Sequence, residues 1–314
     1  MRVTQSMLSS NMLRNLSNSY SKMGKLQNQI NSGSKITRPS DDPVVAVKGI
    51  GYRTNLNKVE QYKRNMGEVE NWLDTSDDTL DHVGIALRRV QELVTNAPND
   101  TNTDEDREKM KKEIDQIKLQ IRDLANTKVG EKYLFSGTNT LSPVFSTDGT
   151  NDIFAGVIIN PARGIEGSIE DTPPASGFTN SVEIEVYDGV NLNVNTDTLE
   201  MFAQIDDMLT NIQKDLSTAG TSGAQIGSHL STISTVQNKV LENRADIGAR
   251  QNRVDMMINR LATQEVVVTK QLSDNEDIDY ERVITDMITQ ESIHQAALSV
   301  GAKIIQSTLV DFIR

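Results

Sequence analysis

Apolar residues near the N-terminus recur at steps of three or four from Leu8 to Ile30. That spacing places them on one face of an α-helix. Gly33 suits the residue that follows a helix, and Arg38-Pro39 cannot easily continue one, because a proline pushes the preceding residue out of the α region. The pattern predicts a helix that ends just before Gly33 and carries this apolar face: Val3, Leu8, Met12, Leu16, Tyr20, Met23, Leu26 and Ile30.

A second helix is expected to begin at Asp42-Pro43. Asp42 can cap it, and a proline at the first helical position forgoes a hydrogen bond that would be unmade anyway. From Val59 to Val94 the apolar steps are three or four over about five heptads, apart from one step of seven, which is typical of a coiled-coil seam. If residues 43–97 form one helix, it is ~80 Å long, and a helix of that length predicts a rod.

Further helical segments follow the break at Pro98-Asn99-Asp100. Apolar stripes run from Met110 to Leu124 and from Leu199 to Leu216, and the last long seam runs from Ile226 to Leu272. After an acidic break over residues 274–279, the C-terminal segment carries one more stripe. Four polar residues occupy positions of the last long seam, where they cost stability but can fix the register of a coiled coil: Gln237, Arg244, Gln251 and Glu265.

Residues 136–197 have a different character. They hold four of the seven prolines and many Gly, Thr, Asn and Asp residues. Apolar and polar positions alternate on both sides of Asp188-Gly189, a dipeptide that favours tight turns. This pattern predicts a β-hairpin within a small inserted β domain.

Together the segments predict a mainly α protein with a β insertion, in which the N- and C-terminal segments form an elongated coiled-coil helical rod around a small central β domain. We expect four parts. They are an N-terminal helical assembly segment that pairs with the C-terminal one (1–42), a coiled-coil rod domain (43–135 and 198–274), a β-rich outer domain (136–197) and a C-terminal helical assembly segment (275–314).

The two ends carry opposite charge. Residues 1–40 contain six basic residues and no acid, whereas residues 274–314 contain eight acids and three bases. Complementary charge favours contact between the terminal helices, within one molecule or between neighbours.

Each terminal segment also has one apolar stripe that needs a partner. A free amphipathic segment would be disordered, because burial would not offset the entropy of ordering it. We therefore predict termini that fold against neighbouring subunits, and the alternative is stable pairing within the monomer. The expected assembly interface consists of Val3, Leu8, Leu16, Met23, Ile30, Ile284, Met287, Leu298, Ile305, Leu309 and Phe312.

Composition excludes several classes of protein. A net charge of −12 disfavours nonspecific nucleic-acid binding, and the lack of cysteine excludes disulfides and thiolate sites. The longest aliphatic run, Val44–Val47, is far shorter than the ~20 apolar residues of a membrane span. Polar residues follow Arg2 where a secretory signal needs an apolar region. We expect no nucleic-acid partner, no membrane insertion and export without a cleaved signal peptide.

The histidines give no support for catalysis or metal binding. His82, His229 and His294 have no second histidine or cysteine within helical reach, so neither a zinc site nor a catalytic triad is indicated. Trp72 lies next to the seam residue Leu73, and we favour a packing role for it over an exposed interface role.

Two short motifs also fail as binding sites. Asp100 begins a stretch similar to a calcium loop, but Glu105 replaces the required glycine and Lys111 replaces the bidentate glutamate. Gly49-Ile50-Gly51 lacks the third glycine and the preceding strand of a dinucleotide loop. The sequence thus predicts no enzyme activity, no cofactor and no metal.

Two stretches resemble signatures of the bacterial flagellin superfamily. One runs from Asn31 to Pro43 and contains Arg-Pro-Ser-Asp-Asp-Pro, and the other runs from Ile247 to Arg253. The order of helical ends around a variable β centre is also similar to that superfamily and covers essentially the whole chain. The resemblance implies a structural protein of the bacterial flagellum, exported unfolded to the outside of the cell.

Within the superfamily, three segments are similar to the branch that forms the hook–filament junction: Met1-Arg2-Val3-Thr4-Gln5, Glu131–Thr138 and Ser307–Arg314. This resemblance implies a ring of copies that provides the platform for flagellin polymerisation, with a filament flagellin as the alternative. The implied partners are further copies of the chain, hook-associated junction protein 1 on the hook side, flagellin, and a cytoplasmic export chaperone at the C-terminal segment.

Overall fold

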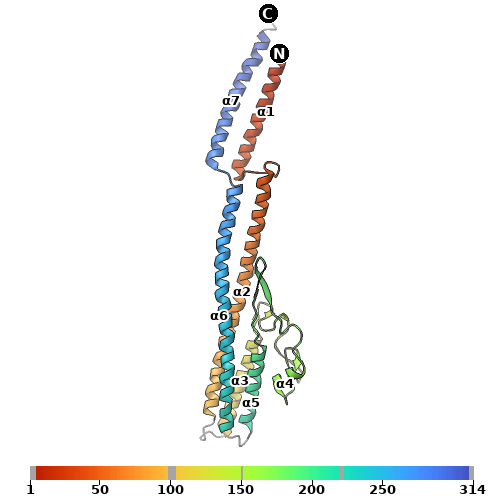
Figure 1. Ribbon diagram of the computed structural model, residues 1–314, viewed down its shortest axis with the longest axis vertical. Coiled ribbons are helices and arrows are strands. Elements are labelled where there is room, and N and C mark those ends of the chain that lie inside the picture. Colours follow the sequence, from red (N-terminus) through yellow and green to blue (C-terminus); the bar gives the residue numbers. More distant parts are fainter. Residues whose placement is uncertain (1–4, 98–103, 150, 219–222, 311–314) are drawn as a thin grey trace. The chain divides into compact units, whose positions relative to one another are not determined.

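The computed structural model describes residues 5–97, 104–149, 151–218 and 223–310 (Figure 1). The chain divides into two units. One unit combines residues 1–60 with residues 263–314, and the other comprises residues 61–262. Each unit therefore draws helices from both halves of the sequence. The protein is mainly helical with small sheets in a central insertion, which confirms the predicted fold class.

The first unit contains the terminal helices α1 (Gln5–Ser32) and α7 (Tyr280–Val310), which pack side by side. It also contains the start of α2 (Pro43–Asn96) and the end of α6 (Gly223–Glu276). The Asp42 carboxylate accepts hydrogen bonds from the backbone N–H groups of Val44 at 3.0 Å and Val45 at 3.2 Å. The predicted cap of the second helix is thus confirmed.

The second unit is built around the predicted heptad seam. Leu73, Leu80, Leu87 and Val94 of α2 are fully buried. They belong to a core that also takes residues from α6, α3 (Asp104–Ala125) and α5 (Leu199–Ser217), and α3 packs directly on α5. Trp72 is also buried, in line with the packing role predicted for it.

Polar residues of the α6 seam are partnered across the helix pair. Arg244 donates from Nε to Asp77 at 2.8 Å and from Nη1 to Asp81 at 2.5 Å, and the hydrogen bond with Asp77 raises the pKa of its guanidinium above the ordinary value. Gln251 donates to Asp74 at 2.8 Å. These directional contacts bind α6 to one register on α2.

Among the described residues, one small antiparallel sheet precedes the insertion directly and two more lie within it. The strands are β1 (Lys128–Val129) and β2 (Lys132–Tyr133), then β3 (Phe145–Asp148), β4 (Asn151–Phe154) and β5 (Val157–Ile158), and finally β6 (Glu183–Tyr187) and β7 (Val190–Asn193). The last pair is the hairpin predicted around Asp188-Gly189, with a register shift between Glu185 and Tyr187.

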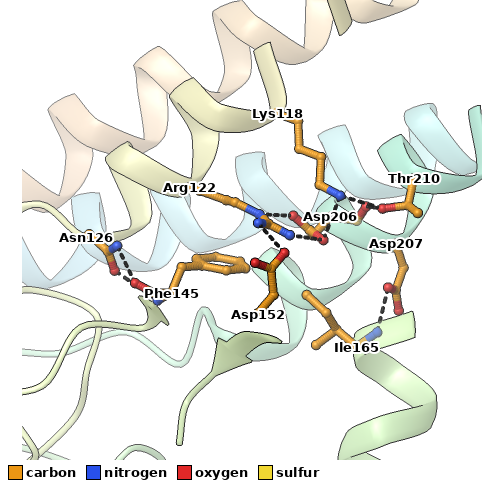
Figure 2. A network of polar contacts seen from close by, with 9 residues as sticks. All are labelled: Lys118, Arg122, Asn126, Phe145, Asp152, Ile165, Asp206, Asp207 and Thr210. Carbon is orange, nitrogen blue, oxygen red and sulfur yellow. Dashed lines mark hydrogen bonds and ion pairs between the residues drawn. The ribbon is translucent and has the colours of Figure 1, made fainter. Parts of the chain in front are cut away.

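A short helix in the insertion, α4 (Gly164–Asp171), is absent from the sequence prediction. Its first turn is capped by Asp207 of α5, whose carboxylate accepts a hydrogen bond from the backbone N–H of Ile165 at 2.6 Å (Figure 2). The same carboxylate accepts a hydrogen bond from the backbone N–H of Glu166 at 2.8 Å. Gly164 has a φ of +73°, and a Cβ on it would lie 2.5 Å from that carboxylate. A cap supplied by a residue far along the chain leaves no local signal, which explains the omission.

A charged cluster attaches the insertion to the helices (Figure 2). Arg122 of α3 donates to Asp206 of α5 at 2.6 Å and to Asp152 of β4 at 2.7 Å, and Lys118 lies 3.2 Å from Asp206. Burial lowers the pKa of the Arg122 guanidinium, but the hydrogen bonds and charges of the two carboxylates outweigh it and raise the pKa above its ordinary range. Asp206 is 6% exposed, so these two cations compensate for the loss of water around its buried carboxylate.

Replacement of the central cation tests this cluster. We expect Arg122→Ala to lower the free energy of unfolding by about 2–3 kcal/mol, because it removes one of the two cations paired with a buried carboxylate. Arg88→Ala, at an exposed position of α2, should change it by less than about 0.5 kcal/mol. Urea unfolding of the full chain measures both, and equal midpoints would contradict the role of the cluster.

Candidate assembly interface

The two linkers that lead to the terminal helices are hydrogen-bonded to each other. The backbone N–H of Lys35 donates to the carbonyl of Glu276 at 2.7 Å, and that of Ile278 donates to the carbonyl of Gly33 at 3.1 Å. Ser34 and Asp277 form an antiparallel bridge between these contacts. Two segments at opposite ends of the sequence are thus paired as in a very short sheet.

Side chains strengthen this joint. Glu276, whose side chain is 13% exposed, lies 2.5 Å from the Nη2 atom of Arg53. Asn275 donates to the carbonyl of Val45 at 3.0 Å. Gly49 is buried where α2 meets Glu276, and a Cβ at this position would lie 2.1 Å from the Glu276 carboxylate. The absence of a side chain at Gly49 therefore lets the end of α6 approach α2.

The proline-containing run that carries the family signature forms an ordered turn around Asp41. This carboxylate accepts the backbone N–H of Arg38 at 3.0 Å and that of Thr37 at 3.3 Å, and Lys25 of α1 lies 3.6 Å away. The hydrogen bond from Arg38, helped by Thr37 and Lys25, lowers the pKa of Asp41 below its ordinary value. The turn therefore prefers Asp41 in its ionised form.

The seam between α1 and α7 combines half-buried apolar side chains with buried small and polar groups. Ser19 is buried and accepts a hydrogen bond from the Gln290 side chain at 2.7 Å. Gly301 is also buried and lies directly against Met12. Tyr20 and His294 are in ring contact, with their centroids 6.2 Å apart.

The predicted interface residues fall into three groups. Four are half-buried (Leu16, Met23, Ile30 and Met287), and two are exposed (Ile284 at 45% and Leu298 at 47%). Val3 and Phe312 lie outside the described residues, as do the side chains of Leu8, Ile305 and Leu309.

Outward-facing apolar side chains are more numerous than the sequence pattern indicated. The helix pair exposes large apolar residues that bury little within the chain, although a typical amphipathic helix turns such residues inward. They are not members of the predicted stripes, although Ile288 follows the stripe residue Ile284 at helical spacing. They are Met7, Leu13, Ile288, Ile293 and Val300, each at least 52% exposed.

We also searched the described residues for metal sites and for membrane-spanning helices. Within these parts of the chain, no group of three His, Cys, Asp or Glu residues could hold a metal ion. The first four residues of the calcium-loop-like stretch, from Asp100 on, lie outside the described residues. None of the helices, as far as they are described, is long and apolar enough to cross a membrane.

Comparison with known proteins identifies the family. The bacterial flagellin N-terminal helical region matches residues 3–140, and the bacterial flagellin C-terminal helical region matches residues 230–313. The two matches together cover more than half of the chain. The chain belongs to the bacterial flagellin family. The family resemblance predicted from the two sequence signatures is thereby confirmed.

Relatives within the flagellin family match almost the whole chain. Flagellar hook-associated protein 3 of Escherichia coli (strain K12) is 23% identical over 309 residues, which span 95% of each chain. The flagellin of Bacillus subtilis (strain 168) is 24% identical over 306 residues, which span 96% of each chain. These relatives place the chain among the structural proteins of the flagellum.

A solved structure supports the fold. It is described as a putative flagellar hook-associated protein from Vibrio parahaemolyticus and matches with a TM-score of 0.61 at 21% identity. The match covers 76% of this chain and all of the solved chain. The part of the chain that is matched therefore has the fold of this solved structure.

Two glycines of α2 give a matched test of the joint. An alanine is more favourable than glycine within a helix, so Gly51→Ala, whose Cβ meets nothing within 4 Å, should stabilise the chain by about 0.5–1 kcal/mol. Gly49→Ala should lack this gain, because its Cβ displaces Glu276 from Arg53. Urea unfolding and amide exchange over residues 44–56 measure the difference, and identical behaviour of the two variants would contradict close packing at Gly49.

The Asp41 turn gives a prediction about pH. Since the pKa of Asp41 is lower in the folded chain than in the unfolded one, its stabilising contribution is complete above the ordinary aspartate pKa of about 3.9 and is lost as the pH falls through the lower folded value. A carbon NMR titration of the Asp41 carboxyl should therefore have a lower midpoint than the same residue in an unfolded peptide of residues 36–43. An equal or higher midpoint would contradict the hydrogen bonding described.

Proposed function

We propose that this chain forms the junction between the hook and the filament of the bacterial flagellum and provides the platform on which flagellin polymerises. The observation that carries the proposal is the outward apolar surface of the α1–α7 pair. A large exposed apolar surface marks a site of protein association. In a flagellar family, the natural occupants of that surface are neighbouring subunits.

Two sequence relationships support the junction role. Proteins named flagellar hook-associated protein 3 from Escherichia coli and Salmonella typhimurium both match 95% of the chain. The segments at the start, at Glu131–Thr138 and at the end are also similar to the junction branch. Flagellin is the second candidate, because the Bacillus subtilis flagellin matches equally well in extent and identity.

The parts of the chain have distinct roles in this proposal. Residues 1–42 and 275–314 assemble with neighbouring copies, residues 43–135 and 198–274 form the rod, and residues 136–197 face outward. The partners are copies in a ring, hook-associated junction protein 1, flagellin, and a cytoplasmic export chaperone on the C-terminal segment. The chain has no catalytic role, needs no cofactor or metal and leaves the cell without a cleaved signal peptide. A chain without cysteine suits export in an unfolded state, since no disulfide can obstruct it.

Deletion of the gene distinguishes the two candidates. A strain that lacks a junction protein should carry bare hooks and shed monomeric flagellin into the medium, because export continues while the filament has no platform. Electron microscopy and an assay of flagellin in the medium give the result. Bare hooks without shed flagellin would favour the flagellin alternative, and normal filaments would contradict the junction role.

A point variant tests the exposed surface itself. Ile284→Asp introduces a charge at a side chain that is 45% exposed, so it should change the free energy of unfolding by less than about 0.5 kcal/mol and yet fail to restore filaments in the deletion strain. Leu141→Asp, at a position 79% exposed in the insertion, is the matched control and should restore them. If Ile284→Asp restored filaments as well as the control, this face would have no part in assembly.

A further inference from the structure

A cavity of about 450 Å³ lies beside α4 and α5, far from the terminal helices in sequence. The two helices pack on each other, and residues of the segment 172–179 complete the walls (Figure 1). The floor is apolar, because Leu199 and Ala203 of α5 are buried and Ile169 and Pro174 are half-buried. A cavity of this volume is within the usual range for ligand pockets.

Hydrogen bonds hold the walls of this cavity in place. The first turn of α4 is attached to α5, since Asp207 accepts the backbone N–H of Ile165 at 2.6 Å. After α4, the backbone N–H of Ala175 donates to the carbonyl of Ala155 at 3.0 Å. Helix α4 and the segment that follows it are therefore anchored separately. A cavity that is already formed costs a partner less ordering entropy on binding.

Carboxylates surround the apolar floor, and no cation lines the cavity. Lys239 of α6 lies 2.9 Å from one of these carboxylates, that of Glu200. Among the described residues, the other three have no cation within ion-pair distance, and they are Glu166, Glu170 and Asp197, all exposed. The cavity thus combines an apolar surface with uncompensated negative charge.

The arrangement of these carboxylates does not suit a metal ion. Within the described parts of the chain, no three acidic side chains or histidines are placed to share one. An anion would be repelled, and a purely apolar ligand would leave the carboxylates without a partner. The cavity is therefore complementary to an organic cation that also has an apolar part.

We propose that this cavity is a docking site for an arginine side chain that a partner protein presents. The methylene stem of arginine is apolar and would cover Ile169 and Leu199, while the charged end reaches the rim. The guanidinium group has five N–H donors and is weakly hydrated, so it can serve more than one carboxylate at low cost in desolvation. The inference concerns the insertion alone and does not depend on the junction role.

Methyl NMR of the purified full-length protein tests the docking. The probe is the peptide acetyl-Gly-Arg-Gly-amide, and the same peptide with citrulline has nearly the same shape without the charge. We expect the arginine peptide to shift the methyl signals of Ile169, Leu199 and Ala203 in a saturable manner. The citrulline peptide should bind about tenfold more weakly, because it loses its ion pairs with the exposed carboxylates.

Two pairs of substitutions test whether the rim carboxylates are responsible. Glu166→Gln with Glu170→Gln keeps the size of the side chains and should weaken binding of the arginine peptide about tenfold. Glu131→Gln with Asp148→Asn removes two exposed carboxylates that do not line the cavity, and it should leave binding unchanged. The second pair controls for the lower net charge of the first.

Several results would overturn the proposal. They are an absence of saturable shifts at the three methyl groups, equal binding of the two peptides, and equal weakening by the two pairs of substitutions. Spermidine provides a further comparison, since stronger binding of spermidine than of the arginine peptide would identify a site for free polyamines and not for a protein side chain. The assay uses purified protein, so none of these results depends on the outcome of the gene deletion.

Discussion

The hydrogen bonds between residues 33–35 and residues 276–278 join the two ends of the sequence. Both linkers to the terminal helices pass through this joint, where Glu276 also meets Arg53 and packs against Gly49. Because the backbone groups of each linker satisfy those of the other, neither linker can change direction without breaking hydrogen bonds. The pairing of α1 with α7 therefore begins at a fixed point and does not depend on apolar burial alone.

That constraint explains how the terminal helices can keep apolar residues on their outer surface. In an isolated amphipathic pair, burial of the largest apolar side chains decides which faces meet. Here Ser19, Gln290 and Gly301 lie in the seam beside half-buried apolar residues of the stripes, while Leu13 and Ile288 remain exposed. The free energy available from covering those side chains thus remains for contacts with other molecules, as the proposed assembly role requires.

Much of this structure could be predicted from residue spacing. The helix after Asp42, the heptad seam through Leu73 and Leu87, and the hairpin around Gly189 follow from local patterns, because capping, burial and turn formation depend on nearby residues. Helix α4 could not be predicted in this way, since Asp207 of another helix caps it. The seam positions Arg244 and Gln251 were recognisable as polar, but their partners on α2 depend on the register of two helices distant in sequence.

The candidate interface could be predicted only in part, because contacts between helices that are distant in sequence leave no local pattern. A regular stripe identifies residues that share a face, and Leu16, Met23 and Met287 lie half-buried as members of such stripes. Ile288 and Ile293 are not members of the predicted stripe, and their exposure becomes evident only when the packing of α1 on α7 is known. Family membership indicates assembly but does not identify these side chains.

Hydroxyl-radical footprinting tests the assembly role of the α1–α7 pair most directly, by comparing the purified chain with the same chain in isolated flagella. The probes are Leu13, Tyr20, Ile284 and Ile288, which are all at least 45% exposed in the single chain. We expect strong labelling in the free protein and marked protection in flagella, with Leu141 of the insertion labelled alike in both states. Equal labelling of the four residues in the two states would show that neighbouring subunits do not cover the terminal helices, and it would contradict the assembly role.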